Sequence, residues 1–228
     1  MTDSTTNAAA SPPQAAQDHR HYLRPHYQPG IPAVIEVPDA PLSELLETAA
    51  RFYPDRVAID FLGAAMTYRE LLEASERAAQ VLRTSGVHKG DRVALIMPNC
   101  PQHAVALYGA LRIGAVVAEH NPLAPAEEIR SQLDAHGARV VIVWEKGVGL
   151  VTDPRPASRA DGDALQGRTV FSVDLSAAMP VRLRAALRLP VERARRQRAA
   201  FRARSLPAGV RSWDKEVAGA HRIPSRFP

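Results

Sequence analysis

The sequence predicts an α/β protein built on a doubly wound, mostly parallel sheet. Three short apolar runs, residues 92–97, 115–118 and 139–143, alternate with helical segments along the middle of the chain. Runs this short, without alternation of polar residues, are typical of strands that are buried on both faces. Strands that alternate with helices pair in parallel through right-handed crossovers. We therefore expect helices on both faces of one sheet layer.

A helix and a short strand precede the buried runs. Asp39 can cap the helix with its side chain, and Pro54 ends the apolar pattern that follows. Residues 57–61 then read as a strand, and residues 62–65 as its turn. This part of the chain predicts one helix followed by one strand.

The next helix has recognisable signals at both ends. Thr67 and Glu70 form a T-x-x-E capping box, in which each side chain can satisfy a free N–H group of the first turn. Gly86 follows the last apolar position of the helical pattern, as a glycine commonly does after a helix. The helix is expected to bury the face that carries Leu71 and Leu82.

Helices are also expected after the first two buried runs. One starts at Pro101 and ends at Gly114, and another follows Pro125 and ends at Gly137. Proline is tolerated in the first turn because its missing N–H has no partner there, and glycine adopts the left-handed conformation that often ends a helix.

The C-terminal third has weaker patterns. Residues 147–168 read as a loop, residues 169–173 as one more strand, and residues 181–204 as an arginine-rich helix interrupted near Pro190. The last 24 residues show no clear element. We therefore divide the chain into a disordered tail, an extended arm, a partial α/β domain and an arginine-rich, irregular C-terminal segment: residues 1–18, 19–40, 41–175 and 176–228.

Charge is concentrated in one segment of the chain. Residues 181–204 hold nine arginines and one acid, Glu192, for a local net charge of +8, so the rest of the 228 residues carries −3 of the total +5. The segment suits a solvated surface helix, a contact with anionic membrane lipid, or nucleic acid phosphates. Nucleic acid is the least favoured partner because few aromatic residues lie nearby to stack on bases. The residues assigned to a possible anionic surface are Arg193, Arg195, Arg196 and Arg198.

Phosphate-binding and metal-binding signals are weak. The sequence contains neither G-x-x-x-x-G-K-[ST] nor G-x-G-x-x-G, and Gly147-Val-Gly149 is a lone G-x-G in a predicted loop. The N-terminal histidines His19, His21 and His26 lack the spacing of a metal site. Cys100 is interpreted as a small residue at a helix cap and not as a nucleophile. No catalytic, cofactor-binding or metal-binding residue is assigned.

Composition favours a cytoplasmic protein. A single cysteine excludes an internal disulfide, and the opening residues do not resemble a signal peptide. No run of 18 apolar residues is present, so a membrane contact would be peripheral, at the inner face of the membrane.

Seven segments occur in an order that matches a known family. They are DRVAI (55–59), MTYREL (66–71), GVHKGDRV (86–93), MPNCP (97–101), ALRIGAVV (110–117), NPL (121–123) and GARVVI (137–142). Together they resemble the adenylate-forming superfamily, and specifically the bacterial long-chain fatty acyl-CoA ligases. The arm RPHYQPGIP (24–32) is similar to the start of the fatty-acid branch.

The resemblance implies a large α/β body and a reaction in two steps. In such ligases ATP and a fatty acid give an acyl-adenylate and diphosphate, and CoA then displaces AMP. ATP, Mg²⁺ and CoA are implied for the complete enzyme. The family's phosphate loop, adenine segment, ribose-binding Asp and catalytic Lys lie downstream of the matched region, so none of them falls on a residue of this sequence.

Three functional readings follow from this resemblance. The first is an N-terminal fragment of a long-chain fatty acid–CoA ligase, inactive alone, whose partner is the remainder of the ligase in trans. The alternative is a non-enzymatic remnant that binds a membrane or a protein partner through residues 181–204. The third is the product of a broken gene without a selected role.

Overall fold

The computed structural model describes residues 28, 39–152, 165, 167–203 and 205–223. The chain divides into two compact units, residues 1–40 and 41–228, and the fold given below is that of the second unit. The predicted tail and nearly all of the predicted arm lie outside the described residues. The division expected at residue 175 stays a prediction.

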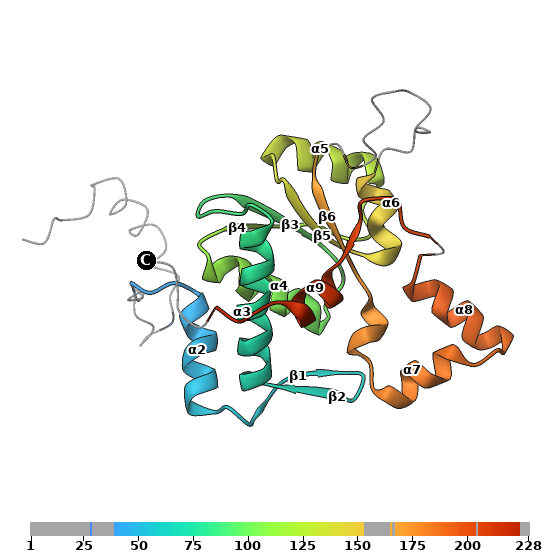
Figure 1. The fold of residues 1–228 in the computed structure, drawn as a ribbon, viewed down its shortest axis with the longest axis horizontal. Coiled ribbons are helices and arrows are strands. Elements are labelled where there is room, and N and C mark those ends of the chain that lie inside the picture. The colour runs from blue at the N-terminus through green and yellow to red at the C-terminus, as the bar shows by residue number, and fades with distance from the viewer. Residues whose placement is uncertain (1–27, 29–38, 153–164, 166, 204, 224–228) are drawn as a thin grey trace, which may run out of the picture. The chain divides into compact units, whose positions relative to one another are not determined.

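Helices and strands alternate through most of the second unit (Figure 1). In chain order, its elements are α2 (Ser43–Phe52), β1 (Val57–Phe61), β2 (Ala64–Thr67), α3 (Tyr68–Thr84), β3 (Arg92–Ile96), α4 (Pro101–Arg112), β4 (Val116–Glu119), α5 (Ala126–His136), β5 (Val140–Trp144), η2 (Glu145–Gly147), α6 (Val148–Val151), β6 (Thr169–Val173), η3 (Leu175–Ala178), α7 (Val181–Arg188), α8 (Glu192–Phe201), β7 (Arg211–Ser212) and α9 (Trp213–Gly219).

Five strands form one parallel sheet in the order β4-β3-β5-β6-β7. The chain moves outward from β3 to β4 on one side and then through β5, β6 and β7 on the other. This reversal defines a doubly wound sheet with a switch point between β3 and β5. The predicted fold class is confirmed.

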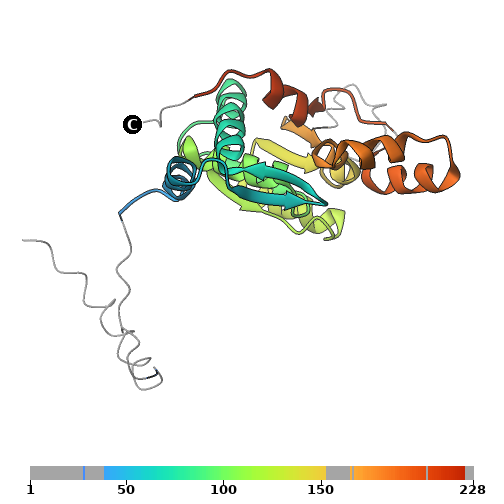
Figure 2. The same cartoon turned by 90° about the horizontal axis from the view of Figure 1, so that it is seen from below.

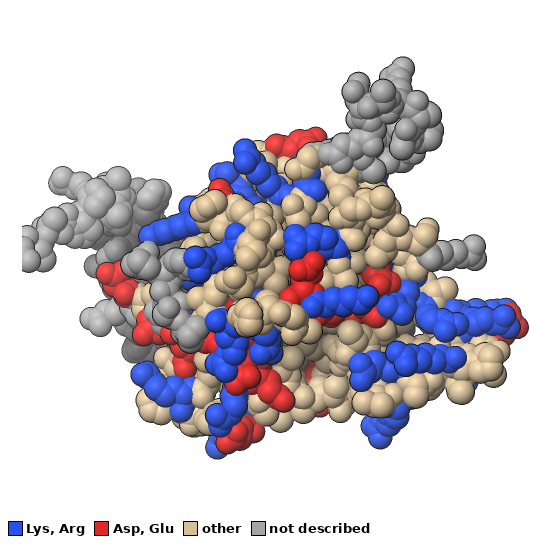
Figure 3. Space-filling model, in the orientation of Figure 1, with Lys and Arg blue, Asp and Glu red and all other residues tan. Residues whose placement is uncertain are grey.

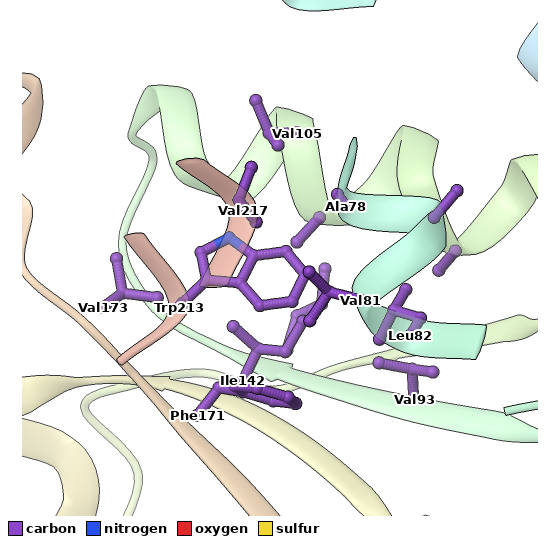
Figure 4. Close-up of a cluster of buried hydrophobic side chains, with 14 of the residues drawn as sticks. Ala78, Val81, Leu82, Val93, Val105, Ile142, Phe171, Val173, Trp213 and Val217 are labelled. Atoms are coloured by element: carbon purple, nitrogen blue, oxygen red, sulfur yellow. The ribbon is translucent and has the colours of Figure 1, made fainter. Parts of the chain in front are cut away.

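Alternate residues of the strands face two separate helical layers. Val93 and Leu95 of β3 belong to a core that also contains residues of α3, α4 and α9. Ala94 and Ile96 belong to the opposite core, formed with α5 and α6. This period of two explains why the strands are apolar throughout, since both of their faces are covered. Figure 4 shows Trp213 of α9 within the first core, among side chains that include Val81, Ile142 and Phe171.

Several local predictions are confirmed. The capping box at the start of α3 forms in both directions, because Glu70 N donates to Thr67 Oγ1 and Thr67 N donates to the Glu70 carboxylate. Gly114 and Gly137 have the positive φ angles of 72° and 67° expected after helices α4 and α5. The arginine-rich segment is broken at Pro190 into two helices, α7 and α8.

Other local predictions are wrong for identifiable reasons. Leu42, and not Asp39, is the N-cap of α2, and it makes no side-chain capping bond. The turn expected at 62–65 is shorter, because residues 64–67 return as β2 and pair with β1 in a hairpin. The strand β4 is only partly buried, since it is an edge strand. The expected loop at 147–168 begins with the short helix α6.

The C-terminal segment is also more regular than expected. It contributes the edge strand β7, which pairs with β6, and the helix α9, which buries Trp213 and Val217. A strand of two residues is too short to give an apolar pattern in the sequence, and a single buried tryptophan does not indicate a helix. Tertiary contacts with the sheet specify these elements.

Candidate functional site at the carboxyl ends of the strands

Polar side chains gather where the parallel strands end. Gln102 lies in the first turn of α4 after β3, Glu145 follows β5, Asp174 follows β6, and Asp214 follows β7. Arg202, at the end of α8, joins them. We call these five residues the strand-end cluster. In open α/β sheets this edge is where ligands bind.

Asp214 is the centre of the cluster. Its carboxylate accepts a hydrogen bond from Asp174 N (2.9 Å) and another from Gln102 Nε2 (3.1 Å). Gln102 Nε2 also donates to the Asp174 carbonyl oxygen at 3.1 Å. These bonds connect α9, α4 and the end of β6. Burial raises the pKa of the Asp214 carboxyl, while the two donors oppose that shift.

Arg202 forms ion pairs with the other two acids of the cluster. Its Nη2 lies 2.7 Å from Asp174 Oδ2, and its Nε lies 3.4 Å from Glu145 Oε2. Burial raises the pKa of Glu145, and the nearby Arg202 guanidinium lowers it. Ion pairs therefore attach the C-terminal end of the arginine-rich helix α8 to the strand ends.

A cavity of about 250 Å³ adjoins the cluster. Gln102 and Asp214 line it together with mainly apolar side chains from α3, α4 and α9, including Ala74, Val105 and Val217. The Oε1 atom of Gln102 is buried and has no hydrogen-bond partner among the described residues. A cavity of this kind would accommodate a small apolar group.

The strand-end cluster does not suit a nucleotide triphosphate. It presents three carboxyl groups and one guanidinium that is already paired with two of them. Phosphate sites need converging N–H donors or cations, so the local charge is of the wrong sign. No step of ATP chemistry is assigned to these residues. Nor does the described part of the chain bring together three metal-ligating side chains.

Two histidines form a separate polar chain beside β4. Ala138 N donates to His136 Nδ1 at 3.2 Å, so Nδ1 carries no proton. His136 Nε2 must then donate to His120 Nε2 (2.9 Å), and His120 Nδ1 to Gln132 Oε1 (2.8 Å). Burial lowers the pKa of His136, with further lowering by His120 and by the positive charges of Arg92 and Arg168.

The predicted anionic-surface residues all lie on α8. Arg193, Arg195 and Arg196 are exposed and Arg198 is half-buried. Figure 3 shows blue side chains gathered over α7 and α8 at the right of the molecule. The contact with an anionic surface remains a prediction.

Other residues considered from the sequence take structural positions. Cys100 is the buried N-cap of α4, and burial raises its thiol pKa to about 11, so it is not activated as a nucleophile. At Gly147 a Cβ atom would lie 2.4 Å from Trp144 Nε1, so this glycine allows close packing of the indole. The histidines His19, His21 and His26 lie outside the described residues.

The strand-end cluster was not predicted from the sequence. Asp174 directly follows the predicted strand 169–173, and Glu145 lies two residues after the predicted strand 139–143. The rule that polar residues after parallel strands meet at one edge could therefore have found both. Asp214 had no such signal because β7 and α9 were not predicted. Arg202 was counted only as part of a charged run.

The arrangement defines a class, a doubly wound parallel α/β layer with polar residues at its strand ends, and comparison with known proteins identifies the family. The model of the AMP-binding enzyme family matches residues 46–199, more than half of the chain. The chain belongs to this family. Long-chain-fatty-acid–CoA ligases are among its relatives: one from Bacillus subtilis is 36% identical over 119 residues, and one from Salmonella typhimurium is 44% identical over 120 residues.

These matches cover 52% and 51% of this chain but only 21% of each relative. The chain therefore spans about a fifth of the length of these ligases. Two solved structures show the same fold, a benzoate CoA ligase from Burkholderia xenovorans (23% identity, TM-score 0.57) and the anthranilate CoA ligase AuaEII (15% identity, TM-score 0.60). Each covers 82% of this chain, and the chain covers 30% of each.

Within the part of the chain that the structure describes, no helix has the length and apolar character needed to cross a bilayer.

Proposed function

We propose that this chain forms the first α/β layer of a long-chain fatty acid–CoA ligase. The complete reaction would convert ATP, a fatty acid and CoA into acyl-CoA, AMP and diphosphate. The observation that carries the proposal is the 36–44% identity to such ligases over about half of the chain. The parallel sheet, with its two helical layers, supports it at the level of fold.

The 228-residue polypeptide is proposed to be inactive by itself. Its strand ends carry acids, which do not stabilise the charge of a transferring phosphoryl group. ATP, Mg²⁺ and CoA would be held by the rest of a ligase, supplied in trans. The partner of this chain would then be that remaining segment.

A complementation assay tests both parts of the proposal. Diphosphate release from ATP is measured with oleate and Mg²⁺, first with this protein alone and then with a Bacillus subtilis ligase shortened by the segment that this chain matches. We expect no release above the protein-free rate from the chain alone. Co-expression of the two chains should give oleoyl-CoA, and the two chains should co-purify.

Matched variants separate docking of a folded layer from a nonspecific effect. Leu95→Asp places a charge at a fully buried position of β3, whereas Leu123→Asp changes a side chain that is 84% exposed. Complementation should be lost with the first variant and kept with the second. Diphosphate release by the chain alone would refute its inactivity. Absence of both oleoyl-CoA and co-purification would refute the ligase role.

The alternative is a non-enzymatic protein that binds a membrane or a partner at the cytoplasmic face of the inner membrane. One observation favours it. No residue of α7 is buried, although α7 lies between two regular elements, η3 and α8. The helix carries Val181, Leu183 and Leu187 and buries none of them fully, so a surface outside this chain could cover these apolar side chains.

A further inference from the structure

The helices α7 and α8 form a hairpin whose tip is apolar and whose sides are basic. They pack on each other, and the connection between them, Leu189-Pro190-Val191, is exposed. Leu189 and Val191 are 52% and 51% exposed. Figures 1 and 2 both show this connection as the part of the hairpin farthest from the sheet.

Among the described residues, most of the hairpin's arginines have no carboxylate partner. Glu192 pairs with Arg196, and Arg202 pairs with the acids of the strand-end cluster. The others form no ion pair with any described residue: Arg182, Arg184, Arg188, Arg193, Arg195 and Arg198. Such a concentration of unpaired positive charge next to exposed aliphatic side chains is not needed for the fold.

Polar contacts attach the base of the hairpin to the domain, whereas its tip is exposed. Lys146 Nζ donates to the Ala199 carbonyl oxygen at 2.9 Å, and Arg202 bridges Glu145 and Asp174. Ala194 is the one residue of the two helices that is fully buried. The attachment therefore holds the hairpin by its base and leaves the tip available to an external surface.

We propose that the tip of the α7–α8 hairpin docks on an anionic lipid bilayer. Leu189 and Val191 would enter the interface between headgroups and acyl chains, and the flanking Arg188, Arg193 and Arg195 would contact lipid phosphates. A short apolar insertion gives weak binding by itself, and basic residues add attraction to an anionic surface. This proposal names the partner of the alternative role above and does not depend on ligase activity.

The chemistry favours lipid over nucleic acid. Nucleic acid would use the arginines but not the aliphatic tip, which would remain in water. The hairpin has no aromatic side chain besides Phe201, which lies at its base. Base stacking therefore has no support at the tip.

Vesicle flotation of the 228-residue protein tests the proposal, because it requires no ATP and no second chain. The vesicles contain phosphatidylcholine alone, or phosphatidylcholine with a third of phosphatidylglycerol. We expect flotation only with the anionic vesicles, weakened by added salt. A negative result here leaves the complementation assay unaffected, so the two proposals fail separately.

Two pairs of variants localise the contact. The double change Leu189→Ser and Val191→Ser should weaken binding by about tenfold or more, because both side chains lose their burial in the interface. The single change Leu123→Ser removes a leucine elsewhere that is even more exposed, at 84%, and should have no effect. The double change Arg193→Gln and Arg195→Gln should weaken binding by about thirtyfold. Arg92→Gln with Arg139→Gln removes the same charge from two exposed positions, the first residue of β3 and the residue before β5, and should leave binding unchanged.

Circular dichroism spectra of each variant confirm that the fold is kept. The proposal is overturned if the protein does not float with anionic vesicles, or floats equally with neutral ones. It is also overturned if tip and control variants behave alike, or if a single-stranded oligonucleotide displaces the vesicles at equal phosphate concentration.

Discussion

At the scale of single residues, the Asp214 carboxylate joins three segments that are distant in the sequence. It accepts hydrogen bonds from Asp174 N and Gln102 Nε2, and it belongs to α9. Asp214→Ala would leave both donors without this acceptor in a partly buried site. We expect a loss of about 2–3 kcal/mol in the free energy of unfolding, measured by urea denaturation.

Glu127→Ala serves as the control for this variant. Glu127 is exposed in the first turn of α5, and its removal should change stability by no more than about 0.5 kcal/mol. If Asp214→Ala were as mild as Glu127→Ala, the hydrogen bonds of the cluster would contribute little to the fold. The Asp214 side chain would then be available for a purely chemical role.

The histidine pair predicts a pH dependence with a definite sign. Burial, His120 and nearby arginines hold the pKa of His136 below its usual value of 6.5. As the pH falls below about 6.5, the unfolded chain takes up a proton that the folded protein resists, so stability falls. Below the folded pKa the loss levels off. Urea denaturation between pH 7.5 and 5.5 should show this decline.

Two variants identify the group responsible. His136→Gln should flatten the decline, whereas His221→Gln, at an exposed position, should leave it unchanged. The pKa values of Asp214 and Glu145 are raised, so these two carboxyl groups act in the opposite direction. Their contribution to the stability of the protein is present at low pH and is lost as the pH rises through the raised values. A decline that survives in His136→Gln would contradict the assignment.

At the scale of elements, the crossing of α3 and α4 depends on Gly109. A Cβ atom at this position would lie 2.7 Å from Ala78 Cβ and 3.1 Å from Ala79 N. Alanine is the better helix former by about 1 kcal/mol, but here the methyl group would force two helices apart. We expect Gly109→Ala to destabilise the protein by about 2 kcal/mol in urea denaturation.

Gly149→Ala provides the matched comparison. Gly149 lies in α6, and a Cβ atom there would meet nothing within 4 Å. The same substitution should therefore be neutral or slightly stabilising. Equal effects at the two positions would show that helix propensity, and not the close approach of α3 and α4, determines the outcome.

Most elements could be predicted because local signals agreed with the tertiary structure. The strands β3, β5 and β6 are apolar since both faces are covered, and α3 carries its own capping box. The elements that were missed depend on distant partners. The strand β2 follows a turn and exists through its pairing with β1, and β7 has two residues that pair with β6. For the same reason only part of the strand-end cluster could be predicted. Glu145 and Asp174 follow predicted strands, whereas Asp214 belongs to an element that was not predicted.

At the scale of the whole molecule, the C-terminal segment closes the first core. Trp213 is 1% exposed, and its ring centroid lies 5.4 Å from that of Phe171. Beyond α9, Arg222 Nε donates to Glu76 Oε2 at 2.7 Å, and Arg112 Nε donates to the Ile223 carbonyl oxygen at 3.1 Å. The segment is thus held by an indole at one end and by a buried ion-pair network at the other.

This double attachment predicts that α9 unfolds together with the sheet. Trp213→Ala should lower the free energy of unfolding by about 3–5 kcal/mol, because it opens a cavity against Phe171 and the helices of the first layer. Trp213→Phe retains most of the volume and should cost less. Native-state hydrogen exchange gives the decisive comparison. If α9 is integral, amides of β5 and β6 lose protection in Trp213→Ala along with those of α9; loss confined to α9 would instead make it an appendage on a self-sufficient four-stranded sheet.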